Sequence, residues 1–124
     1  MRHSCLLLAP IAALTLLASP ASAQMQQSDA SYETKLKCGV FNAFMSGFNG
    51  EDTDEGKAAE ARAESWVMLA MTERADQMEK VATDFEAAAN ELTKQIEGKI
   101  AADDTLGVFA VFNQYLELCD PYGG

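Results

Sequence analysis

Histidine is missing from residues 24–124, because the single histidine of this 124-residue chain is His3. Without histidine, this part of the chain cannot build Ser-His-Asp or Cys-His nucleophile systems, His-ligated zinc sites or the His axial ligand of helical haem proteins. It also has no C-x-x-C sequence, so thioredoxin-like redox chemistry and covalent haem attachment have no motif. Sustained period-two alternation, which indicates strands, does not occur. These absences leave a helical protein with few available chemistries.

Long apolar runs are also scarce, and the longest lies near the start of the chain. It extends from Cys5 to Leu17, after Arg2, and is followed by small residues at 21–23. This pattern predicts a cleavable signal peptide over residues 1–23. The run is shorter than the roughly 20 residues of a spanning helix, so we expect export rather than anchoring. The Ala-rich leader favours a Gram-negative periplasm, with a secreted eukaryotic protein as the alternative.

Acidic residues outnumber basic residues in the predicted product. The full chain has 9 Lys and Arg against 19 Asp and Glu, a net charge of −10. Loss of Arg2 leaves 8 basic residues and all 19 acids, so residues 24–124 carry a charge of about −11. Such a surface repels phosphate backbones and anionic lipid, so we expect no nucleic acid partner and no membrane insertion. A basic protein or a cation suits this charge better.

Cys38 and Cys119 are the two cysteines of residues 24–124. A lone pair of cysteines in an oxidising compartment usually forms a disulfide, so we predict a Cys38–Cys119 bond, with two free thiols as the alternative. The bond would close a loop of about 80 residues, for which loop-closure entropy gives roughly 4.5 kcal/mol. That is a large share of the about 5–15 kcal/mol that stabilise a small domain.

The first predicted helix covers residues 29–46, where apolar side chains recur along one broad face. Gly47 and Gly50 are expected to stop it, and residues 49–56 are expected to form an acidic loop. The last predicted helix follows Asp103 or Asp104 as its N-terminal cap and ends at the Asp120-Pro121 pair.

Residues 57–97 contain no glycine or proline and are rich in strong helix formers. One unbroken helix of that length would extend about 60 Å and overhang a compact domain, so we predict a turn between Thr72 and Asp76. Asp76 and Glu79 offer a capping box for the next helix, with Thr83 and Glu86 as an alternative start. Gly98 and the small residues to Ala102 are expected to end that helix. A heptad pattern argues instead for one continuous helix. Its positions are Met71, Ala75, Met78, Ala82, Phe85, Ala89, Leu92 and Ile96.

The predicted fold is therefore all-α. We expect a small antiparallel up-down four-helix bundle, or three helices if the central segment is unbroken, with one disulfide between the first and last helices. With one cysteine in the first helix and one near the end, the layout resembles that of uncharacterised small exported helical proteins of Gram-negative bacteria. The resemblance covers residues 24–124 and implies neither an activity nor site residues.

Two groups of side chains are candidate metal ligands. Hard cations such as Ca²⁺ bind carboxylates, and four of these lie between Gly50 and Gly56, although their register does not fit an EF-hand loop. Soft thioethers bind Cu(I), and three methionines fall within a narrow arc if their segment is one helix. Core packing and a solvated loop explain the same residues without a metal. The candidates are Glu51, Asp52, Asp54, Glu55, Met68, Met71 and Met78.

The remaining features favour binding over catalysis. Trp66 is expected to fill the core, with ligand stacking as the alternative. Paired carboxylates of the glycosidase type need a cleft that a small bundle rarely provides, so we expect no enzymatic activity and no cofactor. We expect a non-enzymatic periplasmic binding or accessory protein with an unknown, basic protein partner. The alternatives are a periplasmic metal-handling protein and an acid-stress chaperone whose charge reverses at low pH.

Overall fold

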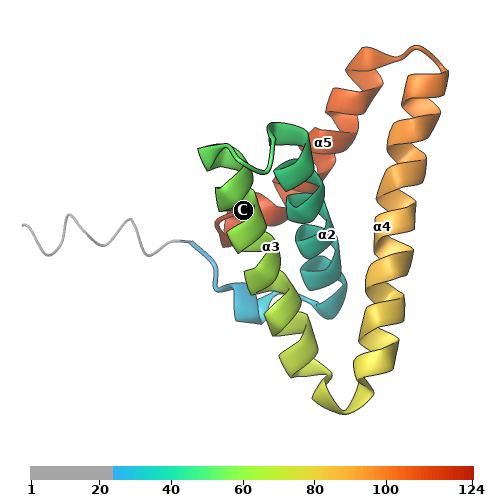
Figure 1. The fold of residues 1–124 in the computed structure, drawn as a ribbon. Coiled ribbons are helices and arrows are strands. Elements are labelled where there is room, and N and C mark those ends of the chain that lie inside the picture. The colour runs from blue at the N-terminus through green and yellow to red at the C-terminus, as the bar shows by residue number, and fades with distance from the viewer. Residues whose placement is uncertain (1–23) are drawn as a thin grey trace, which may run out of the picture.

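Four α-helices make up most of the protein in the computed structural model, which describes residues 24–124. They are α2 (Tyr32–Asn49), α3 (Asp54–Glu73), α4 (Met78–Ala101) and α5 (Thr105–Cys119), and their directions alternate (Figure 1). Short 3₁₀ turns lie at Gln27–Asp29, Ala75–Gln77 and Asp120–Tyr122. Within residues 24–124 there is no strand, so the all-α prediction is confirmed. The predicted signal peptide lies outside the described residues.

Helix α2 begins at Tyr32, directly after the capping residue Ser31. The Ser31 hydroxyl accepts a hydrogen bond from the Thr34 backbone N–H at 3.1 Å, which satisfies one of the donors that a helix N-terminus leaves open. The helix then runs past Gly47, so the prediction that Gly47 stops it is wrong. Gly50, with φ of +98°, ends it instead, because glycine adopts a positive φ without steric conflict.

Helix α3 begins earlier than expected, at Asp54. The Thr53 hydroxyl accepts a hydrogen bond from the Gly56 N–H at 2.9 Å, so Asp54 and Glu55 lie in the first helical turn and not in a loop. Their carboxylates face the positive end of the helix dipole, which stabilises this start. A Cβ atom on Gly56 would lie 1.9 Å from the Gly50 carbonyl oxygen, so only glycine fits this tight connection.

The predicted break between Thr72 and Asp76 is confirmed, because α3 ends at Glu73 and α4 begins at Met78. The predicted capping box is wrong: Gln77 precedes α4, and no side chain caps the helix there. The heptad pattern does not form a continuous seam, because the turn interrupts it and Met78 and Ala82 are exposed. Tertiary contacts at the turn therefore override the periodicity.

The end of α4 and the start of α5 lie where the sequence predicted them. Helix α4 ends at Ala101, within the small-residue stretch from Gly98 to Ala102. Asp104 caps α5, with its Oδ1 accepting from the Gly107 N–H at 2.8 Å, and Asp120-Pro121 follows the end of α5; both predictions are confirmed.

Helix α2 is the central element of the bundle. It packs against α3, α4 and α5, whereas α3 and α4 diverge from their shared turn and contact each other little (Figure 1). The larger core cluster joins α2 to α4 and α5 and consists of Phe41, Leu92, Ile96, Val111, Phe112 and Tyr115. The smaller cluster joins α2 to α3 and the chain end and consists of Ala30, Cys38, Trp66 and Cys119.

Candidate functional site

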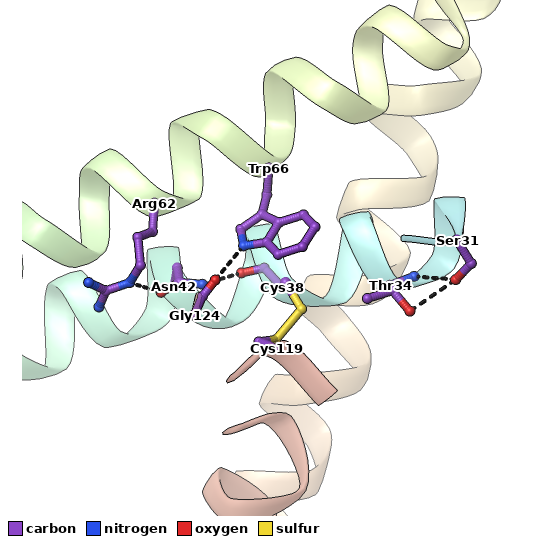
Figure 2. The surroundings of a disulfide bond; sticks show 8 residues. All are labelled: Ser31, Thr34, Cys38, Asn42, Arg62, Trp66, Cys119 and Gly124. Atoms are coloured by element: carbon purple, nitrogen blue, oxygen red, sulfur yellow. Dashed lines mark hydrogen bonds between the residues drawn. A yellow bond between two sulfur atoms is a disulfide. The ribbon is translucent and has the colours of Figure 1, made fainter. Parts of the chain in front are cut away.

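The Cys38–Cys119 disulfide lies in the smaller core cluster and joins α2 to the end of α5 (Figure 2). The prediction of this bond is confirmed. The two Cα atoms are 5.8 Å apart, and both cysteines are almost fully buried. Their sequence separation of 81 residues means that the bond restrains most of the chain. It is a structural link, because both sulfur atoms are shielded from solvent reagents.

Trp66 of α3 covers the disulfide. It is 0% exposed, and its ring lies edge-on to Tyr122 with centroids 5.7 Å apart. The indole Nε1–H donates a hydrogen bond to the Gly124 carbonyl oxygen at 2.7 Å (Figure 2). A fully buried ring with a satisfied N–H packs the core, so the core interpretation of Trp66 is confirmed and ligand stacking is not supported.

Two buried polar residues on α2 escaped the sequence analysis. Asn42 is 3% exposed; its amide nitrogen donates to the Cys38 carbonyl oxygen at 2.8 Å, and its Oδ1 accepts from Arg62 Nε at 2.9 Å (Figure 2). Lys35 is 4% exposed and forms an ion pair with Glu73 at the end of α3. The only sequence signal of their burial is that each lies next to an apolar residue of the helix, Lys35 beside Leu36 and Asn42 beside Phe41. This signal is weak.

A second polar cluster joins α2 to the α3–α4 turn. The Tyr32 hydroxyl donates to Asp84 Oδ2 at 2.8 Å, Lys80 Nζ lies 3.1 Å from the same oxygen, and the Arg74 guanidinium lies 4.0 Å above the Tyr32 ring. Burial, and then the hydrogen bond to Asp84, raise the pKa of Tyr32 to about 12. The hydrogen bonds from Tyr32 and Lys80 lower the pKa of Asp84. A phenol that holds its proton so firmly is a poor general base. The three contacts tie α2 to the α3–α4 turn and to α4.

The four acidic residues that were candidate calcium ligands do not converge. Glu51, Asp52, Asp54 and Glu55 are all exposed. Among residues 24–124, no group of three or more His, Cys, Asp or Glu side chains is arranged to hold a metal ion. Asp54 and Glu55 contribute to the start of α3 instead.

The three methionines do not share one helix, so the interpretation of a continuous methionine row is wrong. Met68 and Met71 belong to α3, and Met78 is the first residue of α4, beyond the turn. Met68 is 60% exposed and Met78 is 43% exposed. Copper binding would need their sulfur atoms to point at one position, and the turn separates them.

Comparisons with known proteins provide no relative. No family model, no curated protein and no solved structure matches the chain. In addition, none of the helices between residues 24 and 124 combines the length and apolar character needed to span a bilayer. The surface of the protein therefore carries the remaining evidence on function.

Among the hollows on the surface of residues 24–124, two combine apolar residues with charged residues that are all acidic. The larger of these two, of about 590 Å³, lies between α2 and α3. Its lining residues are Ala43, Ser46, Glu51, Glu60, Ala63, Glu64, Val67 and Met68. The smaller, of about 300 Å³, lies where the end of α2 meets the α4–α5 connection, and it is mainly apolar. Its lining residues are Phe48, Ile100, Asp103, Asp104, Thr105, Val108, Phe109 and Phe112.

The distribution of charge is more uneven than the composition. All 19 acidic residues except Asp84 and Asp104 are exposed, whereas only four of the eight basic residues are. The exposed basic residues are Lys57, Lys80, Lys94 and Lys99. Of these, Lys80 is paired with Asp84 and Lys99 lies 3.8 Å from Asp104. The fold therefore directs much of its positive charge into internal contacts and presents a strongly negative surface.

Proposed function

We propose that this chain is an exported, non-enzymatic binding or accessory protein that engages a basic partner through its acidic surface. The observation that carries the proposal is the segregation of charge, with 17 exposed acidic residues against four exposed basic ones. A field of one sign attracts oppositely charged proteins and raises their association rate.

Export is supported by two features. The first 23 residues have the composition of a signal peptide. The Cys38–Cys119 disulfide persists in oxidising compartments such as the bacterial periplasm and is rare in the reducing cytosol. A periplasmic protein meets partners in the same compartment. The expected partner is therefore a basic protein of the cell envelope.

Affinity capture with a charge-reduced variant tests this function. The protein purified from cells expressing the full chain is immobilised and exposed to an envelope extract at low salt and at about 1 M salt, where the Debye length falls to about 3 Å. We expect basic proteins to be retained at low salt and released at high salt. The charge-reduced variant combines Glu60→Gln, Glu64→Gln, Glu79→Gln and Glu86→Gln, all at exposed positions.

A matched variant separates charge from surface chemistry, because it changes four exposed neutral residues to alanine. These residues are Gln26, Thr93, Asn113 and Gln114. The charge-reduced variant should lose most of the captured protein, and the matched variant should retain it. Equal capture by both variants, or capture that persists at high salt, contradicts the proposal.

An acid-stress chaperone is a second candidate, because carboxylates hold α2 to the α3–α4 turn. Asp84 accepts from Tyr32, and Glu73 pairs with the buried Lys35. Protonation of both would weaken this corner and expose apolar surface. The test is whether the protein at about pH 2–3 loses near-ultraviolet circular dichroism and prevents aggregation of an acid-denatured client. A protein that keeps its native signal and leaves aggregation unchanged rejects this candidate.

A further inference from the structure

Large apolar side chains gather near the turn between α4 and α5. This turn lies at the upper right of Figure 1. Phe48, Ile100 and Phe109 line the smaller hollow and are 60%, 64% and 52% exposed. Leu106, one turn before Phe109 on α5, is 83% exposed. These four residues are called the tip patch below. Single exposed apolar residues are ordinary, but a group from three helices around one hollow is typical of a binding surface.

The hollow has a rigid aromatic floor. Phe112 is buried, and the rings of Phe48 and Phe109 both meet it edge-on, with centroids 5.4 Å and 6.0 Å away. Phe112 is fixed in turn by Phe41 of the main core, 6.3 Å away. A volume of about 300 Å³ accommodates an apolar side chain from another molecule. Because the floor belongs to the core, this hollow is preformed and its occupation needs little ordering.

The rim of the hollow is acidic. Asp103 and Asp104 both line it. Asp104 caps α5 and lies near Lys99, whereas Asp103 is exposed and forms no ion pair within residues 24–124. A cationic side chain reaching this rim would find Asp103 available next to an apolar hollow.

We propose that the tip patch binds a basic amphipathic helix of the partner protein, with an apolar side chain in the hollow and a Lys or Arg beside Asp103. The proposal rests on the proposed function and gives it a place on the surface. An amphipathic helix presents apolar side chains along one face and cations at its edges, which matches an apolar hollow with an acidic rim.

Charge favours this occupant over a second copy of the chain and over an anionic lipid surface. A second copy of the chain would bring another Asp103, another Asp104 and a net charge of about −11 against the same rim. Like charges at an interface oppose association, so self-pairing is disfavoured. An anionic lipid surface meets the same repulsion.

Two designed peptides test the proposal by fluorescence anisotropy. The first is a labelled helical peptide with leucine at every third and fourth position and lysine elsewhere; the second keeps every lysine and replaces every leucine with glutamine. The leucine peptide should bind at least about tenfold more tightly than the glutamine peptide, because leucine side chains fill the apolar hollow and glutamine side chains do not. The protein is the exported form purified from cells expressing the full chain.

Matched substitutions locate the binding. Phe109→Ala should weaken binding of the leucine peptide about tenfold, whereas Met68→Ala, at a 60% exposed position on α3, should change it less than about twofold. Asp103→Asn removes a charge but keeps a residue that tolerates the φ of +55° found there. It should weaken binding more than Glu64→Gln, which removes one charge from the other hollow. Thermal unfolding of each variant confirms that it is folded.

The outcomes separate this inference from the proposed function. Equal binding of both peptides, or equal effects of Phe109→Ala and Met68→Ala, overturns the tip patch while the acidic surface keeps its role. Failure of both peptides to bind at low salt counts against both proposals. A dimer in analytical ultracentrifugation that Phe109→Ala dissociates would make a second copy the occupant and overturn the inference.

Discussion

At the scale of single residues, Gly39 shows how closely α2 packs against two neighbouring helices. A Cβ atom at this position would lie 3.0 Å from Phe85 Cε1 of α4 and 3.4 Å from Trp66 Cβ of α3. Gly47, two turns later on the same helix, has no atom within 4 Å of such a Cβ. The two glycines therefore have different roles in one helix: Gly39 permits contact, and Gly47 only lowers helix propensity.

Alanine substitutions at the two glycines should change stability in opposite directions. Gly47→Ala should stabilise the protein by about 0.5–1 kcal/mol, because alanine loses less conformational entropy in a helix. Gly39→Ala should be about 1–2 kcal/mol less stable than Gly47→Ala, since the added methyl group displaces Phe85 or Trp66. Urea unfolding of both variants measures the difference. Equal stability would show that α3 and α4 accommodate the added methyl group at Gly39 without cost.

The Lys35–Glu73 pair should be asymmetric to substitution. Lys35 is 4% exposed, and the Glu73 side chain is 36% exposed. Glu73→Ala leaves a buried ammonium without its partner and should destabilise the protein by about 2–3 kcal/mol. Lys35→Met keeps the buried volume and removes the charge, so its effect should stay below about 1 kcal/mol. The free energies of unfolding of both variants give the comparison, and a larger loss for Lys35→Met would contradict it.

At the scale of helices, the turn between α3 and α4 is fixed by contacts across it. Tyr32 of α2 joins Asp84 of α4 through a hydrogen bond and lies under Arg74 of the turn. Glu73 and Lys80 complete the charged groups around this corner. These contacts hold the turn in place although no side chain caps the start of α4.

The free energy of unfolding should therefore fall at low pH and at high pH. Tyr32→Phe should make both losses smaller. The folded-state pKa of Asp84 is lowered, so its stabilisation is present above about pH 4 and is lost as pH falls. The folded-state pKa of Tyr32 is raised to about 12, so its stabilisation is present below about pH 10 and is lost as pH rises through about 12. Unfolding free energy measured against pH checks both limbs. Identical curves for the wild type and Tyr32→Phe would contradict this account.

Local patterns predicted the helices better than their ends. Composition and length were enough to place the α3–α4 break, and Asp104 was identifiable as a cap because it precedes a helical stretch. Gly47 was expected to end α2 but lies inside it, because nothing near it opposes continuation of the helix. The buried Asn42 and Lys35 depend on Arg62 and Glu73, which are distant in sequence, so no local pattern could identify them.

At the scale of the whole molecule, the disulfide and the surface charge act against each other. A charge of about −11 on residues 24–124 favours expansion, and the Cys38–Cys119 bond limits it. The disulfide was predictable because it needed only two cysteines, whereas the tip patch was not, since it forms where three helix ends meet. Surface sites of this kind depend on the fold and leave no local motif.

Removal of the disulfide should lower stability by about 2–4 kcal/mol without changing the helical fold. Trp66 reports on the change directly, because it is the only tryptophan and packs against the bond. The Cys38→Ser/Cys119→Ser variant should unfold at lower urea concentration with a similar dependence on urea. Unchanged stability would show that the core clusters alone hold the four helices together.

Association kinetics test whether the acidic surface recruits a basic partner. Surface plasmon resonance with a partner captured from the envelope separates the association rate from the dissociation rate across a range of salt concentrations. Electrostatic recruitment predicts an association rate that falls about tenfold or more between low salt and about 1 M salt, with a smaller change in dissociation. An association rate that is independent of salt would contradict the account.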